Sequence, residues 1–272
     1  MSNPQKPIKP IGQKGYGSIP HLPGSRLGPG EHTVPEGQFA ICCLRPRDRH
    51  DRVIVTEKLD GSNTSVALVD GRVIALNRAG YPVASSPYLQ HRMFAVWVDD
   101  SEDRLKTVLR EGERIVGEWL VQAHGTRYVL PHEPWVVFDL LRGHERIPFD
   151  EFRRRAVAGG FILPRVLHDG GPFSIESAIA LLHPSGHGAI DPVEGAVWRV
   201  ERRGKPDFLA KYVRPDKVDG IYLPDTGSSV TGGRSLWNWW PGCDEFYARF
   251  PTSGFLVTPG GGMEPIKTLT EV

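Results

Sequence analysis

The stretch VTEKLDGSNTSV, residues 55–66, decides how the rest of the chain is interpreted. An apolar run at 53–55 leads into it, and a β-prone run at 64–69 leads out of it. Lys58 therefore stands near the end of an expected strand, between two acids and shortly before Gly61. A surface lysine needs no such neighbours, whereas a reactive lysine does.

A lysine must be neutral to act as a nucleophile. At its unperturbed pKa, only about one lysine side chain in a few thousand is neutral at pH 7. Desolvation or a nearby cation lowers that pKa, and a divalent metal held by a carboxylate such as Asp60 is the strongest such cation. Gly61 would let the backbone approach a ligand closely. From this pattern alone, an exposed hairpin lysine beside a solvated aspartate is the favoured interpretation.

Composition limits the kinds of partner. The chain has 272 residues with 33 basic and 32 acidic side chains, so its overall charge predicts no general affinity for nucleic acid or membrane. Segment 199–217 is locally basic, with seven Lys or Arg against three acids, and is either a binding surface or a solvated hairpin. Three cysteines without a pairing pattern fit a reducing compartment. The absence of a long apolar run and of a signal-peptide core predicts a cytoplasmic protein without membrane contact.

The periodicity predicts an α+β fold with antiparallel strand pairs, because helices stand between paired strands without strict βαβ alternation. Residues 1–50 are rich in Pro and Gly and are expected to be mostly loop. Strands are expected at 53–58, 64–69, 72–78, 114–120, 135–141, 194–202 and 207–214, with turns at Asp70-Gly71 and Arg203-Gly204. Helices are expected at 88–98, 102–110, 148–160 and 173–183, the last with Ser174 as its N-cap.

Six short segments then follow one another in a recognisable order. They are EKLDGSN at 57–63, NRAG at 77–80, GEWL at 117–120, VVFDL at 136–140, EGAVWR at 194–199 and LAKYV at 209–213. With these motifs, the region from about Tyr16 to Arg214 resembles the ATP-dependent RNA ligases of the covalent nucleotidyltransferase superfamily. The resemblance implies a nucleotidyltransferase (ATP-grasp-like ligase) core of antiparallel sheets flanked by helices. It places this adenylation domain at 1–214 and leaves 215–272 as a small C-terminal appendage or packed tail.

The resemblance also implies roles for individual residues. Lys58 would attack the α-phosphorus of ATP and become lysyl-AMP. The expected catalytic residues are Lys58, Asp60, Glu118, Glu194 and Lys211. Three of these, Asp60, Glu118 and Glu194, would hold a metal, mostly through water. The expected nucleotide-binding residues are Glu57, Arg78, Phe138 and Val197, with Phe138 and Val197 on the two faces of the adenine. The expected RNA-binding residues are Asn63, Arg214 and Lys217.

The implied reaction joins RNA ends in three steps. Lys58 takes AMP from ATP with Mg²⁺ or Mn²⁺, the AMP passes to a 5′-phosphate, and a 3′-hydroxyl displaces it. The implied partners are RNA with these two ends and an end-healing enzyme that prepares them. Each role also makes local sense, because phosphoryl transfer depends on positive charge and in-line positioning.

One position departs from the family pattern. The fifth motif commonly has two lysines two positions apart, and here the first of them is Leu209. The charge near the α-phosphate is therefore lower, or Lys205, Arg214 or Lys217 supplies it.

Other functions stay open at this point. A DNA ligase or a GTP-using capping enzyme shares the chemistry, but the roughly 58 residues after the fifth motif are short for the barrel that normally follows. A catalytically silent RNA-binding module of the same fold is the alternative from another class. Retention of Lys58 together with the acids around it favours catalysis.

The tail is unusually aromatic. LWNWWPGCDEFYARF, residues 236–250, contains six Trp, Tyr or Phe rings. These rings either pack the tail onto the core or stack on RNA bases beside Arg234 and Arg249. The second possibility predicts that a truncation near residue 228 still forms lysyl-AMP but no longer seals RNA.

Overall fold

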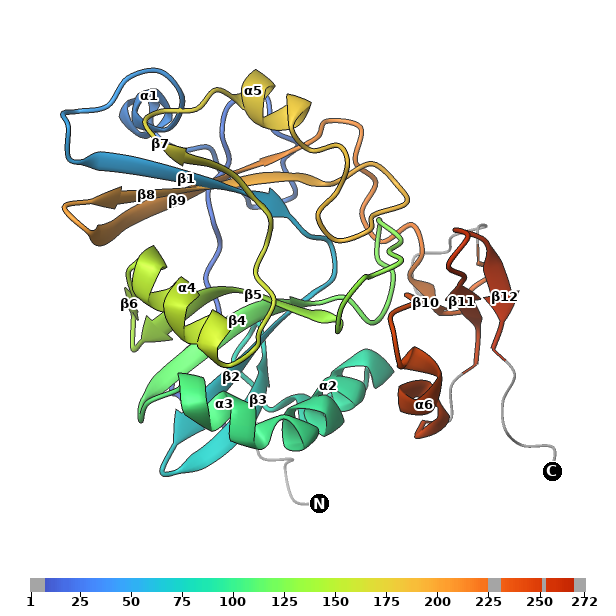
Figure 1. Cartoon of the computed structure of the whole chain (residues 1–272). Helices are drawn as coiled ribbons and strands as arrows, with labels where there is room; N and C mark the ends of the chain where they lie inside the picture. Colours follow the sequence, from blue (N-terminus) through green and yellow to red (C-terminus); the bar gives the residue numbers. More distant parts are fainter. Residues whose placement is uncertain (1–7, 225–230, 251–252, 267–272) are drawn as a thin grey trace, which may run out of the picture. The chain divides into compact units, whose positions relative to one another are not determined.

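The structure is a computed structural model that describes residues 8–224, 231–250 and 253–266 (Figure 1). The chain forms two compact units, and each unit is assembled from three separate segments. The described residues of 1–17, 63–119 and 137–163 make the first unit, and those of 18–62, 120–136 and 164–272 make the second. The fold is α+β with mainly antiparallel strands, as the sequence predicts.

The first unit contains a five-stranded sheet in the order β3-β2-β4-β5-β6. Its strands are β2 (Ser62–Val69), β3 (Arg72–Asn77), β4 (Glu113–Trp119), β5 (Trp135–Arg142) and β6 (Glu145–Arg146). Ser62 and the first two residues of β5 are counted with the second unit. The helices are η1 (Val83–Ser85), α2 (Leu89–Asp100), α3 (Glu102–Val108) and α4 (Phe149–Ala158).

Helix α2 anchors the core of this unit. Its buried residues Met93, Phe94 and Trp97 recur at helical spacing and so share one face. The rings of Phe94 and Trp97 lie 5.2 and 5.7 Å from the ring of the buried Trp119 at the end of β4. The indole nitrogen of Trp119 donates to the Gln90 carbonyl at 2.9 Å, so the buried polar atom is satisfied.

The second unit contains a four-stranded antiparallel sheet in the order β7-β1-β8-β9. Its strands are β1 (Asp51–Lys58), β7 (Val166–Gly170), β8 (Gly195–Arg202) and β9 (Lys205–Val213). Its helices α1 (Glu36–Cys43) and α5 (Ile175–Ala180) lie beside this sheet (Figure 1).

The two faces of this sheet differ in chemistry because successive side chains alternate between them. One face carries buried Val53, Val55, Trp198 and Val200, which pack with Cys42 and other residues of one core cluster. The strand register puts Lys58, Gly195 and Val213 in one row of the opposite face, and Thr56, Val197 and Lys211 in the next. The predicted lysine therefore lies on the face away from this core.

The C-terminal segment also belongs to the second unit. It contains a three-stranded sheet of β10 (Leu236–Trp237), β11 (Phe255–Val257) and β12 (Met263–Pro265), and the helix α6 (Cys243–Ala248). β10 pairs with β11 in parallel, and β11 pairs with β12 antiparallel. The predicted boundary at residue 214 does not coincide with the division between the two units.

The predicted strands and helices are confirmed with small shifts of their ends. Ser174 caps α5 by accepting a hydrogen bond from the Ser177 amide, as its side chain predicts. Eight of the described elements were not predicted, namely α1, η1, β6, β7, β10, α6, β11 and β12. The prediction of a loop-dominated segment at 1–50 was wrong over α1, and β7 was not foreseen. Both are short, and β7 contains a histidine, an aspartate and a glycine rather than an apolar run. Among the described residues, no helix is both long and apolar enough to cross a membrane.

Candidate active site

Lys58 is the last residue of β1, opposite Gly195 at the start of β8. Its Nζ donates to Oε2 of Glu194 at 2.6 Å and lies 3.4 Å from the Leu59 carbonyl. The Lys58 side chain is 21% exposed and that of Glu194 only 9%. A side chain at Gly195 would place its Cβ 1.9 Å from the Tyr212 carbonyl oxygen, so glycine is required after the glutamate. The predicted nucleophile and the predicted acid are therefore in contact.

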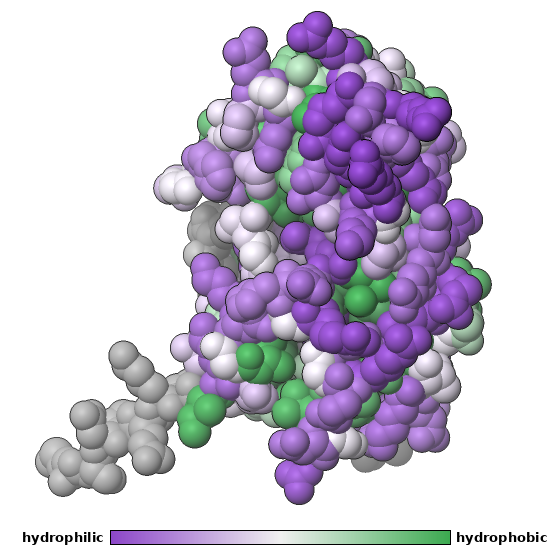
Figure 2. All heavy atoms as spheres, turned by 90° about the vertical axis from the view of Figure 1, so that its left-hand side faces the viewer, coloured by the Kyte–Doolittle hydropathy of each residue, from purple (hydrophilic) through white to green (hydrophobic). Residues whose placement is uncertain are grey.

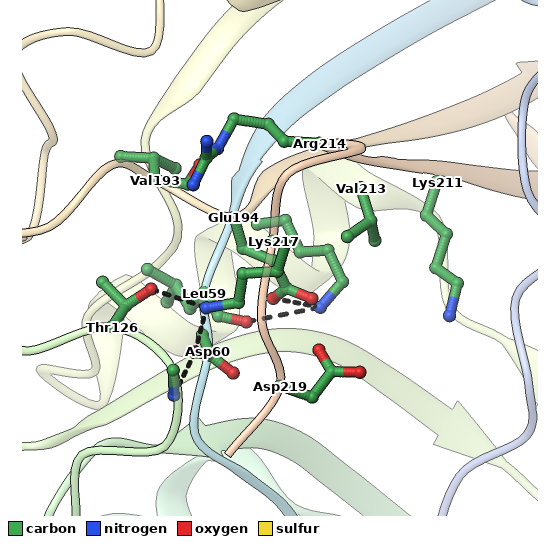
Figure 3. Close-up of polar contacts among 12 residues, drawn as sticks. Leu59, Asp60, Thr126, Val193, Glu194, Lys211, Val213, Arg214, Lys217 and Asp219 are labelled. Atoms are coloured by element: carbon green, nitrogen blue, oxygen red, sulfur yellow. Dashed lines mark hydrogen bonds and ion pairs between the residues drawn. The ribbon is translucent and has the colours of Figure 1, made fainter. Parts of the chain in front are cut away.

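A second ion pair joins Asp60 to Lys217. The Lys217 Nζ contacts Oδ2 of Asp60 and donates to Thr126 Oγ1 at 2.9 Å (Figure 3). The Gly125 amide donates to the same carboxylate oxygen at 2.8 Å, and the Asp60 amide donates to the Tyr128 hydroxyl at 3.1 Å. Lys217 is 3% exposed, so it has little surface to offer RNA. The prediction of an RNA contact by Lys217 does not fit this position.

The pKa values of the two carboxyl groups move in opposite directions. Burial raises the pKa of Glu194, and this effect outweighs the opposing charge of Lys58. Burial also acts to raise the pKa of Asp60, but the positive charge of Lys217 holds it below its usual range. Glu194 is therefore the better proton acceptor, while Asp60 stays ionised.

Lys211 lies on the same face of the sheet, one row further along β9. Its Nζ donates to Oε1 of Glu31 at 2.6 Å. Burial acts to raise the pKa of Glu31, but hydrogen bonds from Lys211 and from the Gly28 amide lower it to about 2. Glu31 was missed by the sequence analysis, because it lies in the loop-rich segment and 180 residues before its partner.

Leu209 stands where the family pattern has its first lysine. It is buried and lies opposite Arg199 in the register, on the same face as Lys211. The Arg199 guanidinium donates to Glu201 at 2.9 Å. The nearest cation in the register is thus already bound to a carboxylate.

Arg214 and Glu57 both have structural contacts. Arg214 donates to the Val193 carbonyl at 2.6 Å and pairs with Asp216, so it braces the loop before Glu194. Glu57 points to the face of the sheet away from Lys58. Its buried carboxylate accepts hydrogen bonds from Ser185 Oγ at 2.5 Å and the Gly186 amide at 2.9 Å. The predicted roles of these residues toward RNA and adenine stay predictions.

The first unit brings three of its predicted residues to one end of its sheet. Thr64 pairs with Asn77, and its Oγ1 lies 3.5 Å from the Gly117 carbonyl. Three predicted site residues, Asn63, Arg78 and Glu118, are the direct sequence neighbours of these three residues and therefore lie at the same end of the sheet. Asn63 Oδ1 is buried and has no hydrogen-bond partner within the described part of the chain.

Phe138 lies on β5 and is half-buried. The ring of Tyr16 packs edge-on against it with a centroid distance of 5.4 Å. The amide of Tyr16 also donates to the Arg78 carbonyl at 3.2 Å. Tyr16 therefore links the residue predicted to stack on adenine with the residue predicted to contact ribose or phosphate.

No preformed metal cage is present among the described residues: no three His, Cys, Asp or Glu side chains are grouped so that they could hold an ion. The carboxylates of Asp60 and Glu194 each face a lysine. This arrangement fits the prediction of contacts through water better than direct ligation.

The aromatic tail is largely packed. Trp237, Trp240 and Tyr247 are buried, whereas Trp239 and Phe246 are half-buried. The packing interpretation is confirmed for the three buried rings.

The tail also holds the backbone beside Asp60. The Asn238 side chain accepts from the Tyr128 amide at 2.8 Å and donates to the Leu120 carbonyl at 2.7 Å. Since Tyr128 in turn contacts Asp60, the tail supports the lysine site. The expectation that its removal spares adenylation therefore loses its physical basis.

Comparison with known proteins identifies the family. A family model described as RNA ligase matches residues 51–213, which is more than half of the chain and includes nearly all of the predicted site residues. The chain belongs to the RNA ligase family. No curated protein sequence matches it.

Several solved structures are similar to part of the chain. An archaeal ATP-dependent RNA ligase is 21% identical, with a TM-score of 0.45, over 73% of this chain and 48% of that one. A Naegleria gruberi RNA ligase with PPi is 16% identical, with a TM-score of 0.43, over 61% of this chain and 50% of that one. A variant of the Naegleria ligase with AMP and Mn is 15% identical, with a TM-score of 0.42 and the same coverage. The chain thus spans about half the length of these proteins.

Proposed function

We propose that the protein is an ATP-dependent RNA ligase that joins 5′-phosphate and 3′-hydroxyl ends through lysyl-AMP. Membership of the RNA ligase family supports the reaction class. The observations that carry the proposal are the contact of the Lys58 Nζ with the buried Glu194 and the ion pair of Asp60 with the buried Lys217.

In the first step the Lys58 nitrogen bonds to the α-phosphorus of ATP, and the bond from that phosphorus to pyrophosphate breaks. Glu194 accepts the proton that leaves Lys58, because burial raises the pKa of its carboxyl group and the two atoms are 2.6 Å apart. Lys217 keeps Asp60 ionised during this exchange. Lys211 leaves Glu31 and contacts the α-phosphate, whose negative charge attracts it.

The remaining residues bind the nucleotide and the metal. Phe138 stacks on the adenine, with Val197 on its other face, while Arg78 contacts ribose or phosphate. The carboxylates of Asp60, Glu118 and Glu194 would hold Mg²⁺ or Mn²⁺, mostly through water, and the ion would supply positive charge that neutralises the phosphates. Glu57 lies near the adenine with its backbone only, because its carboxylate is already held by Ser185 and Gly186.

Two later steps complete sealing. AMP moves from Lys58 to the RNA 5′-phosphate, and the 3′-hydroxyl then displaces AMP. Asn63 and Arg214 contact this RNA. Because the reaction needs these two kinds of end, an end-healing enzyme that produces them is the expected partner.

The test is a two-stage labelling reaction. The protein is incubated with ATP or GTP labelled at the α-phosphate and with Mg²⁺ or Mn²⁺, and then chased with 5′-phosphorylated RNA or DNA. A covalent label that moves to RNA and disappears as sealed product accumulates is the expected result. A label that forms only with GTP indicates a capping-type enzyme, and a chase that works only with DNA indicates a DNA ligase. If no label forms while RNA still binds, the protein is a silent binding module and the proposal fails.

A further inference from the structure

The basic segment 199–217 contains seven Lys or Arg residues, and the structure separates them into two groups. Five have a carboxylate partner: Arg199 with Glu201, Arg202 with Asp48 and Asp51, Lys211 with Glu31, Arg214 with Asp216, and Lys217 with Asp60. The other two are Arg203 and Lys205, at the turn between β8 and β9. Neither has an acidic partner among the described residues, and both are exposed.

These two residues border a hollow at the end of the sheet away from Lys58. It has a volume of about 560 Å³ and is lined by Arg47, Arg202, Arg203, Lys205, Pro206 and Asp207. Figure 2 shows that much of this side of the molecule is covered by hydrophilic side chains. Four of the six lining residues are cations, and the hollow is open, so it suits an extended polyanion better than an enclosed small molecule.

Two arginines of the hollow are held in place by carboxylates. Both oxygens of the fully buried Asp51 carboxylate accept from Arg47, and one also accepts from Arg202 at 3.0 Å. Arg47 additionally pairs with Asp207 at 2.5 Å. Because their side chains are already ordered, these guanidinium groups lose little freedom when an anion binds. A phosphate would have to compete with Asp207 for Arg47, so its binding should depend strongly on salt.

The backbone conformation of the turn is energetically unfavourable for an arginine. Arg203 has a φ of 51° and Gly204 a φ of 71°, a turn that favours Asn, Asp or Gly at the first position. The corresponding turn of the β2–β3 hairpin has Asp70 at that position, with a φ of 50°. An arginine in the left-handed conformation at the rim of a basic hollow is strain of the kind that occurs at functional sites.

We propose that this hollow binds backbone phosphates of the RNA substrate at a distance from the joined ends, an inference that rests on the proposed ligase function. Along β8, Arg202 lies seven residues from Gly195, which pairs with Lys58, so the hollow is roughly 23 Å from the lysine along the strand at about 3.3 Å per residue. Alternation puts Arg202 on the face of Trp198 and Val200, opposite to that of Lys58, so an RNA arm reaches the hollow around the turn end of the sheet. An RNA arm must therefore extend at least about seven nucleotides beyond the join to reach the hollow. The hollow therefore holds one arm of the RNA while Lys58 acts at its end.

The experiment compares the full-length protein with two double variants. The test variant is Arg203→Gln with Lys205→Gln. The matched control is Arg153→Gln with Arg154→Gln, which removes the same charge from exposed positions of α4. Binding of 5′-phosphorylated RNA is measured as a function of salt, with arms of about 4 and about 12 base pairs on either side of the join. Lysyl-AMP formation without RNA is measured in parallel.

The expected result is about tenfold weaker binding of the long-armed RNA by the test variant and a salt slope reduced by about 1 to 2. Short-armed RNA should bind both variants equally, and lysyl-AMP formation should not change. Equal binding by the test and control variants overturns the proposal and leaves a solvated hairpin or an acidic protein as the alternatives. If wild type forms no lysyl-AMP, the ligase function itself fails, whatever the binding result.

Discussion

The two ends of the β8–β9 hairpin carry similar numbers of charged side chains and differ in how these are buried. At the end near Gly195, Glu194 and Lys217 are buried and each is in contact with an opposite charge. At the turn, Arg203 and Lys205 are exposed. Burial raises the pKa of Glu194, so this carboxyl group can accept a proton from Lys58. The exposed cations at the turn attract anions only through interactions that salt screens. The difference separates a place for bond making from a place for substrate binding.

The largest effect is expected at the buried end. Lys58→Arg should abolish lysyl-AMP formation, because a guanidinium group stays protonated and cannot attack phosphorus. Intact mass spectrometry after incubation with ATP measures this directly, and circular dichroism checks the fold. Lys106→Arg, at an exposed position of α3, is the matched control and should react like wild type. An adduct on the Lys58→Arg variant would show that another residue is the nucleophile.

Lys217→Met should cause the next largest effect, because it leaves the Asp60 carboxylate, which is only 13% exposed, without its cationic partner. Breaking a buried pair is expected to lower the free energy of unfolding by about 3 kcal/mol at neutral pH. The lost charge raises the pKa of Asp60, so the variant gains relative stability as the pH falls and Asp60 becomes protonated.

Denaturant unfolding of both proteins between about pH 4 and pH 8 measures this difference. The account predicts that the difference in free energy of unfolding between wild type and variant is largest at neutral pH and becomes smaller in acid. A constant difference across this pH range would mean that Lys217 does not lower the pKa of Asp60.

Phe138→Ala should weaken ATP binding by about 1–3 kcal/mol, the scale of one lost base stack. The apparent ATP affinity in single-turnover adenylation measures it. Phe161→Leu controls for loss of an aromatic ring elsewhere in the same unit, where the ring packs against Trp97. Equal effects of the two variants would assign Phe138 to packing alone.

Much of the fold follows from local sequence. The alternating runs around Lys58 and the turns at Asp70-Gly71 and Arg203-Gly204 specify strand pairs through period and turn chemistry. Since a strand's side chains alternate, the register also explains why Lys58, Val197 and Lys211 share one face.

The partners of these residues could not be predicted in the same way. Lys217 and Asp60 are 157 residues apart, and Glu31 and Lys211 are 180 apart, so neither pair leaves a periodic signal. The basic segment 199–217 shows the same limit, because its charge pattern does not indicate which side chains are buried. Only the fold separates Lys217, at 3% exposure, from the exposed Lys205.

The smallest effect is expected at the exposed end. Arg203→Gln with Lys205→Gln should change the free energy of unfolding by no more than about 0.5 kcal/mol, since neither side chain has a buried contact. Adenylation should stay within about twofold of wild type, because screening by salt is nearly complete over the roughly 23 Å to Lys58. A large loss of adenylation would contradict the separation of the two ends, and single-turnover kinetics would detect it.

The central claim is that Lys58 carries AMP, and one measurement tests it most directly. Wild-type protein is incubated with ATP and Mg²⁺, digested, and analysed by peptide mass spectrometry for the residue that gains one AMP. The account predicts a single modified site at Lys58 that is lost when 5′-phosphorylated RNA is added. AMP on Lys211 or Lys217 instead, or RNA sealing without any protein adduct, would contradict it.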